Sequence, residues 1–353
     1  MSAQTDIEMP DINEQPVREP VRSGPTARAP RGWRLLALSA VALYTTVVLV
    51  LGIYWSVQPA RFDVRAVAAQ RVGGESAPVP GATIVSTIKR VSETLLEKPG
   101  GYLHNDLTLP GFYLDNMPSW EYGVLKEVRD AVRSLRNDFS RSQTQSVENA
   151  NLRKADAFLN YDTDSWILPT SESEYREGIQ ALGRYFDDLV SGDDRSARFF
   201  VRADNLAAYL AVVEKRLGSY AQRLSASVGD AELTAALVGS AASDGVAPEV
   251  RVKTPRLEVD NVFYEARGYA WALLHTLKAL AIEFEPVLRD KNAEVSMQQV
   301  IRDLQESTRR MWSPVVLNGS GFALVANHSL TLASYLSRGN AAVLDLRMLL
   351  QQG

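Results

Sequence analysis

The sequence predicts an all-α protein in which one N-terminal transmembrane helix precedes a bundle of long helices. Residues 35–57 contain no charged amino acid. Apolar residues at alternating spacings of three and four, which indicate packed helices, recur through the rest of the chain. The alternation typical of strands occurs only near 250–259, where a minor β-hairpin is the alternative to a loop.

The composition excludes several classes of protein. The 353 residues are 46% hydrophobic and 23% charged, with a formal net charge of −4, which argues against nucleic acid as a partner. The absence of cysteine excludes disulfides, cysteine nucleophiles and iron–sulfur clusters. The three histidines, His104, His275 and His328, lie far apart in the sequence, so we predict no metal site and no cofactor.

Residues 33–57 form the predicted membrane anchor. A spanning helix needs about 20 apolar residues, and Trp33, Tyr54 and Trp55 stand at its two ends, as in an aromatic belt. The apolar run exceeds the roughly 7–15 residues of a cleaved signal peptide. We therefore expect an uncleaved anchor that contacts the lipid bilayer through residues 35–57.

The charges around the anchor predict its orientation. Five arginines precede the span and three follow it closely, which favours a cytoplasmic N-terminus and a main body on the other side of the membrane. Residues 1–32 contain five prolines and no aromatic residue, so we expect a disordered cytoplasmic tail. Residues 58–81 are expected to be a juxtamembrane linker.

Residues 82–228 form the first predicted helical sub-bundle. Its helices are expected over residues 82–97, from Pro118, after a capping box at Ser171 and Glu174, and along a heptad seam that begins at Leu206. Their apolar seams are Ile84, Ile88, Val91 and Leu95; Val128, Val132, Leu135 and Phe139; Ile179, Leu182, Phe186 and Leu189; and Leu206, Leu210, Val213, Leu217, Tyr220 and Leu224.

Residues 229–258 are a predicted surface loop, and 259–353 form the second predicted sub-bundle, unless the two halves make one continuous bundle. The seam of its first helix runs from Phe263 to Val287 and leaves out His275, which we expect to be exposed and inert. Ser296 is expected to cap a shorter helix. The last helix is expected from near 322 to 350, with the seam Val325, His328, Leu332, Tyr335, Gly339, Ala342, Leu346 and Leu349.

The stretch NGSGFALVANHS, residues 318–329, has the form of a glycine loop before a helix. A phosphate-binding Walker loop requires a lysine, and none follows Lys291. The dinucleotide fingerprint requires a third glycine where Leu324 stands. We therefore expect Asn318 or Ser320 to cap the final helix, with anion binding at its N-terminus as the alternative. We expect His328 to be a hydrogen-bonded core residue, or otherwise a ligand or proton-transfer contact.

Residues 98–123 form a long segment rich in proline, glycine and aromatic residues. We expect an ordered loop that plugs the bundle; the alternative is a recognition surface with Tyr102 and Trp120, since such residues favour interfaces. His104, Asp106, Asp115 and Glu121 could supply general acid–base groups if they lie together. A calcium loop at 160–166 is rejected because Trp166 and Ile167 occupy essential positions.

The chain resembles a proteobacterial family catalogued as the domain of unknown function numbered 2333. The resemblance rests on the runs GGYLHNDLTLPGFYLDNMPSWEYGVL, FSRSQTQS, LPTSESEYREGI, FFVRADNL, LGSYAQRLSASVG, DNVFYEARGYAWALLH, SPVVLNGSGFALVANHSL and SRGNAAVLDLR. It implies a protein of the bacterial inner membrane with one N-terminal span, and it brings no activity, cofactor or catalytic residue.

The function expected from these observations is non-catalytic. A membrane-anchored envelope protein would use a periplasmic helical bundle to bind another envelope protein or a second copy of itself. One alternative is an enzyme that modifies an envelope polymer or lipid with the carboxylates of 98–123. The other is a ligand-sensing helical bundle.

Overall fold

The computed structural model describes residues 31–72, 79–141, 148–192, 197–228, 255, 258–313, 315–319 and 325–352. In these ranges the regular structure is helical, and β pairing is limited to one antiparallel bridge between Asn318 and Asn327. The all-α prediction is therefore confirmed. The predicted tail 1–32 and loop 229–258, with most of the predicted hairpin, lie largely outside the described residues.

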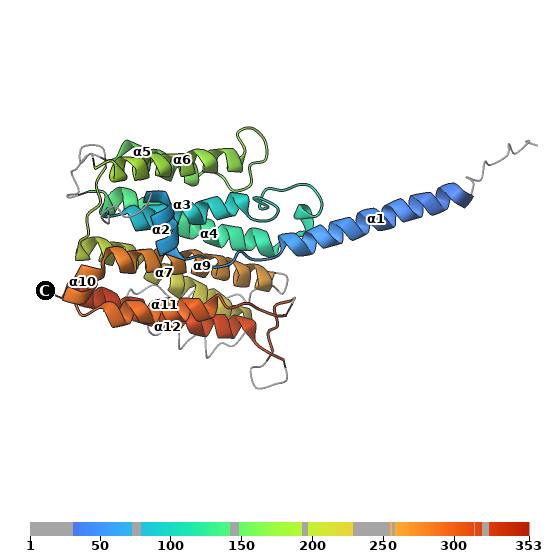
Figure 1. Ribbon diagram of the computed structural model, residues 1–353. Helices are drawn as coiled ribbons and strands as arrows, with labels where there is room; N and C mark the ends of the chain where they lie inside the picture. The colour runs from blue at the N-terminus through green and yellow to red at the C-terminus, as the bar shows by residue number, and fades with distance from the viewer. Residues whose placement is uncertain are drawn as a thin grey trace, which may run out of the picture. The chain divides into compact units, whose positions relative to one another are not determined.

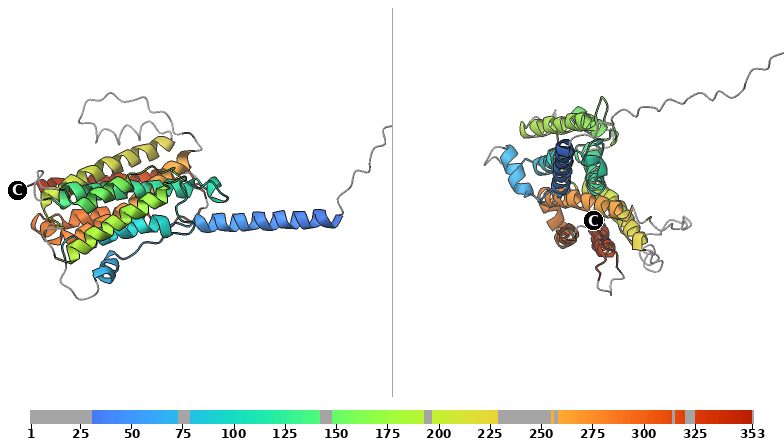
Figure 2. Two further views of the ribbon diagram at one scale, coloured as in Figure 1. Left: turned by 90° about the horizontal axis from the view of Figure 1, so that it is seen from above. Right: turned by 90° about the vertical axis from the view of Figure 1, so that its right-hand side faces the viewer.

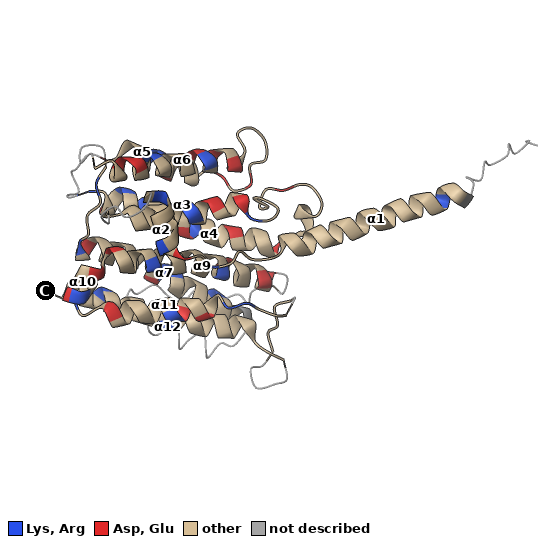
Figure 3. Cartoon of the chain, in the orientation of Figure 1, with Lys and Arg blue, Asp and Glu red and all other residues tan. Residues whose placement is uncertain are grey.

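The N-terminal apolar helix is α1 (Arg31–Trp55). Its residues Gly32–Trp55 are long and apolar enough to cross a membrane, and none of the apolar window is buried against protein. Figure 3 shows this helix uncharged except near its start. A helix of this kind suits a membrane span or a signal sequence. The chain divides into two units, Met1–Val47 and Val48–Gly353, so the last turns of α1 belong to the second unit.

The second unit, called the body below, is a stack of helices (Figures 1 and 2). Its outer layers are the pairs α5–α6 and α11–α12, and α3, α4, α7 and α9 lie between them (Figure 1). The helices are α2 (Val64–Val72), α3 (Ala82–Glu97), α4 (Asn116–Ser134), α5 (Ala150–Leu159), α6 (Ser171–Val190), α7 (Ala203–Val228), α9 (Val259–Glu283), α10 (Glu285–Asp290), α11 (Glu294–Ser307) and α12 (His328–Gln351).

The predicted seams of α3, α4, α6 and α7 are buried at every position, α4 continuing through the π-helical turn Leu135–Phe139. Two of these seams face helices from the other half of the sequence, because α4 packs on α9 and α7 packs on α12, whereas α6 packs on α5 and α3. The body therefore does not divide into the predicted sub-bundles 82–228 and 259–353. Periodicity identifies the apolar face of a helix but not the helix that covers it.

Helices α4 and α9 pack closely, and two glycines allow their backbones to touch. A Cβ atom at Gly123 would lie 1.9 Å from the carbonyl oxygen of Glu265, and one at Gly268 would lie 1.9 Å from that of Trp120. Any larger residue at either position would push the helices apart. The first turns of α4 and α9 are thereby fixed side by side.

Several predicted boundaries and caps are wrong. Residues 58–81 include α2, which packs on α3, and α5 and α10 were not predicted. The final helix begins at His328, and Leu336, Val343 and Leu350 are buried there while Tyr335 and Leu349 are only half-buried. Thr170 rather than Ser171 caps α6, and Ser296 lies within α11.

Candidate functional site

The predicted aromatic segment 98–123 is not one loop. Its last residues, including Trp120 and Glu121, lie in the first turns of α4, and a short 3-10 turn (Gly111–Tyr113) interrupts the rest. Tyr102, Leu103 and Trp120 are buried, whereas Phe112 and Tyr113 are exposed. The segment thus has a buried part that packs on the body and an exposed part between residues 106 and 115.

Glu121 organises the buried part of the segment. Its fully buried carboxylate lies 2.5 Å from the ammonium of Lys98, which is buried as well. It also accepts hydrogen bonds from the backbone N–H groups of Leu103 at 3.0 Å and His104 at 2.9 Å. Burial raises the pKa of Glu121 to about 7, and the charge of Lys98 and these donors oppose that rise. The carboxylate therefore fixes the backbone around residue 103.

The same part of the segment is hydrogen-bonded to the loop between α5 and α6. The hydroxyl of Tyr102 donates to the carbonyl of Thr163 at 3.2 Å, and the amide of Asn105 donates to that of Ser165 at 2.7 Å. The ring of His104 lies 3.1 Å from the carboxylate of Asp164. These contacts hold residues 102–105 and 162–169 together as one surface.

The other predicted acidic candidates have separate surroundings. Asp106 accepts hydrogen bonds from the N–H and hydroxyl of Thr108, at 2.9 and 2.8 Å. Asp115 is the exposed N-cap residue of α4, but its side chain makes no capping hydrogen bond. Burial and then the charge of Asp115 raise the pKa of Asp260 at the start of α9. No hydrogen bond or ion pair within the described residues links Asp106, Asp115 and Glu121 to one another.

The N-cap of the final helix is Asn327, which accepts a hydrogen bond from the N–H of Leu330 at 2.9 Å, so the prediction of Asn318 as the cap is wrong. Asn318 does accept a hydrogen bond from the N–H of Ser329 in the first turn, at 3.2 Å. His328 is hydrogen-bonded as predicted, since its Nδ1 accepts from the N–H of Leu317 at 2.9 Å, but it is half-buried and not in the core. Ser320 lies outside the described residues.

His275 is the clearest error of the sequence analysis. It is completely buried; its Nδ1 lies 2.7 Å from the carbonyl of Trp271, and its Nε2 accepts from the N–H of Phe62 at 3.2 Å. Burial lowers the pKa of His275 to about 4, so the ring is neutral at neutral pH. Helix α9 is apolar along nearly its whole length, which indicates burial on all sides. A position outside its apolar seam is therefore not necessarily exposed.

Glu127 is a buried carboxyl group that the sequence analysis did not single out. It lies within the apolar stripe of α4, and its Oε1 accepts a 2.5 Å hydrogen bond from the hydroxyl of Tyr209. Burial raises the pKa of Glu127 to about 8, which keeps it protonated at neutral pH. Its position among the apolar residues Val124 and Val128 was the sequence signal that could have predicted a buried carboxyl group.

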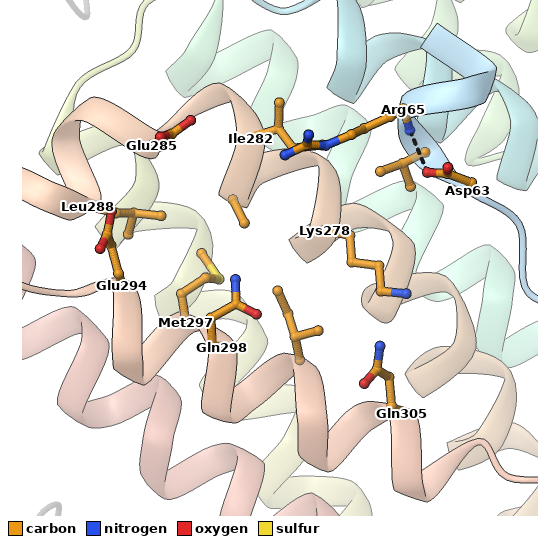
Figure 4. Close-up of a pocket in the computed structure, with 13 residues that line it drawn as sticks. Asp63, Arg65, Lys278, Ile282, Glu285, Leu288, Glu294, Met297, Gln298 and Gln305 are labelled. Carbon is orange, nitrogen blue, oxygen red and sulfur yellow. Dashed lines mark hydrogen bonds between the residues drawn. The ribbon is translucent and has the colours of Figure 1, made fainter. Parts of the chain in front are cut away.

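A cavity of about 480 Å³ lies elsewhere, between α2, α9, α10 and α11 (Figure 4). Basic and acidic side chains, among them Arg65, Lys278, Glu285 and Glu294, line it together with amides and apolar groups. Burial and the nearby Arg61 lower the pKa of Lys278. None of the predicted site residues lines this cavity, and the described part of the chain has no cluster of three metal-ligating side chains.

Residues 28–353 match the family described as "Uncharacterized protein conserved in bacteria (DUF2333)". The chain belongs to the DUF2333 family. The resemblance found in the sequence is thereby confirmed, and the match includes the apolar helix as well as the body. No curated protein and no solved structure matches the chain.

Proposed function

We propose that this DUF2333 protein is a membrane-anchored envelope protein whose helical body acts by binding rather than by catalysis. One observation carries the proposal: the buried polar side chains Asn105 and Glu121 of the segment 98–123 hold loops in place. Glu121 fixes the backbone at 103 and 104, and Asn105 fixes that at 165. A group that holds the backbone in this way supports a rigid surface, which is what a binding protein presents to its partner.

The anchor is proposed to be uncleaved and to cross the bacterial inner membrane once. Trp55, at the end of α1, packs against the body's apolar core. A Cβ at Gly100 would lie 2.8 Å from its ring, so a residue larger than glycine would displace it. Removal of α1 as a signal peptide would strip this contact from the body. The distribution of arginines supports a cytoplasmic tail and a periplasmic body.

Single-thiol labelling in intact cells tests the sidedness, because the chain has no cysteine. Ser334→Cys places a thiol at an exposed position of α12, and Ser23→Cys places one in the tail as the matched control. A reagent that passes the outer but not the inner membrane should label position 334 and leave position 23 unlabelled until lysis. The reverse pattern would place the body in the cytoplasm and contradict the proposal.

Photo-crosslinking in the same cells tests the binding role. Leu344 and Met348 are exposed apolar residues one turn apart on α12, an outer helix of the body. A crosslinking residue at either position should yield a discrete product with a second copy or one other envelope protein, and Ser334 serves as the polar control. A monomer in light scattering, with no crosslink from either site, would contradict the proposal.

The enzyme alternative makes an opposite prediction for the exposed acids. Asp106→Asn and Asp115→Asn should fail to complement the cellular phenotype of a deletion strain if these groups perform acid–base chemistry. The proposed binding role predicts full complementation by both variants, because each carboxylate is half-buried or exposed and neither holds the body together. Protein levels must match wild type in both comparisons.

A further inference from the structure

Three loops that are distant in sequence meet at one end of the body, and we call them the span-side loops: residues 106–115, 162–169 and 309–327 in their described parts. The first lies where α1 leaves the body, since a Cβ at Gly52 would lie 3.6 Å from that of Pro110. The second is bonded to the first through Asn105 and Ser165. Figure 1 shows these loops gathered at the same end of the stacked helices.

Arg267 joins the third loop to the same place. Its buried guanidinium donates to the carbonyl of Arg309 at 2.8 Å and to that of Ser307 at 3.1 Å. It also donates at 3.2 Å to the side chain of Gln58, three residues after the end of α1. The beginning of the third loop therefore lies beside the point where the chain enters the body.

The span-side loops expose large apolar side chains. The first exposes Leu107, Leu109, Phe112 and Tyr113. The second exposes Trp166, Ile167 and Leu168, of which Leu168 is 89% exposed. The third exposes Trp312, 85% exposed, together with Val315 and Val325. Scattered single apolar residues are normal on a protein surface, but three neighbouring loops with such tips indicate a contact surface.

The chain after α1 fixes this end of the body to the span. The ring of Phe62 stacks on His275 with centroids 4.0 Å apart, and the N–H of Phe62 donates to the same imidazole. Arg61 donates to the carbonyl of Gln305 at 3.4 Å. Residues 58–62 are thus packed on α9 and α11 rather than acting as a free tether.

We infer that the span-side loops insert their apolar tips into the interfacial layer of the bilayer that α1 crosses. The inference rests on the proposed anchoring of α1. Because the loops share the end of the body from which the span leaves and residues 58–62 are packed, the bilayer is the apolar phase next to these side chains. Tryptophan and tyrosine favour that layer, where one part of the ring is apolar and one part is hydrated.

The charges beside the tips indicate which lipids are needed. The span-side loops carry four aspartates, Asp106, Asp115, Asp162 and Asp164, and two arginines, Arg309 and Arg310. This acidic excess offers no attraction to anionic headgroups, so the contact depends on apolar insertion. Docking should therefore occur on zwitterionic phosphatidylcholine and persist at high salt.

Nitroxide accessibility in the full chain, reconstituted in phosphatidylcholine vesicles, tests the inference. Single labels at Phe112→Cys, Ile167→Cys and Val315→Cys report the three loops, and all three parent residues are exposed. Val295→Cys is the matched control: an apolar residue, 75% exposed, twelve residues before the end of α11. Leu43→Cys reports whether α1 is in the membrane.

The expected result is a severalfold higher ratio of oxygen to water-soluble nickel collisions at the three loop labels than at position 295. If the loop labels are as accessible to nickel as position 295 while position 43 is in lipid, the loops do not insert into the bilayer. Without contradicting the membrane anchor, that result would overturn the inference. Loop labels shielded from both reagents would mean that protein covers the loops, which also overturns it. An aqueous position 43 would instead refute the anchor on which the inference rests.

Discussion

The span-side end and the centre of α4 each bury a glutamate, and the surroundings of the two carboxyl groups differ. At the span-side end, where the backbones of α4 and α9 touch at Gly123 and Gly268, Glu121 faces Lys98 and two backbone N–H groups. At the centre, Glu127 faces the hydroxyl of Tyr209. Glu121 holds a loop and is paired with a lysine, whereas Glu127 is a neutral residue of the core.

Burial alone therefore does not decide how a carboxyl group contributes to the stability of the fold. Burial raises the pKa of both groups, to about 7 for Glu121 and about 8 for Glu127. Only Glu121 has a cation and backbone donors beside it, and these make its charged form structurally useful. Substitutions at Lys98 and Glu127 test this distinction, and one at Gly123 tests the backbone contact at the span-side end; they follow from the largest expected effect to the smallest.

Lys98→Ala should have the largest effect, because it leaves the carboxylate of Glu121 buried without its cation. We expect a loss of about 3–5 kcal/mol in the free energy of unfolding at pH 8. The loss should be smaller at pH 5.5, where the carboxyl group can take up a proton. Denaturant unfolding of the detergent-solubilised chain, followed by circular dichroism, measures both values.

The double variant Lys98→Ala with Glu121→Gln is the control for that measurement. The neutral amide oxygen can still accept from Leu103 and His104, so the double variant should recover part of the loss at pH 8. Equal losses for Lys98→Ala at the two pH values would show that the pairing of charges does not set the stability of this end.

Gly123→Ala should have the next largest effect, since its Cβ would clash with the carbonyl oxygen of Glu265. We expect a loss of about 3 kcal/mol, at the upper end of the range for overpacked sites, because backbone cannot move aside as a side chain can. Gly218→Ala in α7 is the matched control, with its nearest neighbour 3.6 Å away at Asn340. It should gain about 0.5–1 kcal/mol. Equal outcomes would mean that α4 and α9 are not in backbone contact.

Glu127→Gln should have the smallest effect at pH 6, about 1 kcal/mol, because the amide resembles the protonated carboxyl group. The pKa of Glu127 is raised in the folded protein, so between about pH 4.5 and 8 the folded state binds one more proton than the unfolded state. The protonation of Glu127 therefore makes the free energy of unfolding fall as pH rises, by about 1.4 kcal/mol per pH unit.

The pH dependence therefore separates Glu127 from the other titrating groups. The variant should lose that slope and gain stability relative to wild type as pH rises from 6 to 8. A difference between the two proteins that stays constant over this range, in the same unfolding measurement, would mean that Glu127 is ionised in the fold.

Features that depend on residues close together in the sequence were predicted correctly, and features that depend on distant residues were not. Seams such as Ile84 to Leu95 were predicted because helical periodicity is local, and α3 buries all four positions. Short helices such as α5 were missed, since ten residues provide little periodicity. Among the candidate residues, Asn318 and Glu121 were predicted to be important, but the residues that they contact, Ser329 and Lys98, were not predicted.

The amino-acid sequence by itself determined the helical class, the apolar N-terminal helix and the buried faces of most body helices. Each depends on composition or spacing within one segment. Only the tertiary structure decided that α4 touches α9, that Phe62 covers His275, and that the three span-side loops share one end of the body. Those outcomes depend on packing between residues far apart in the chain, which no local pattern encodes.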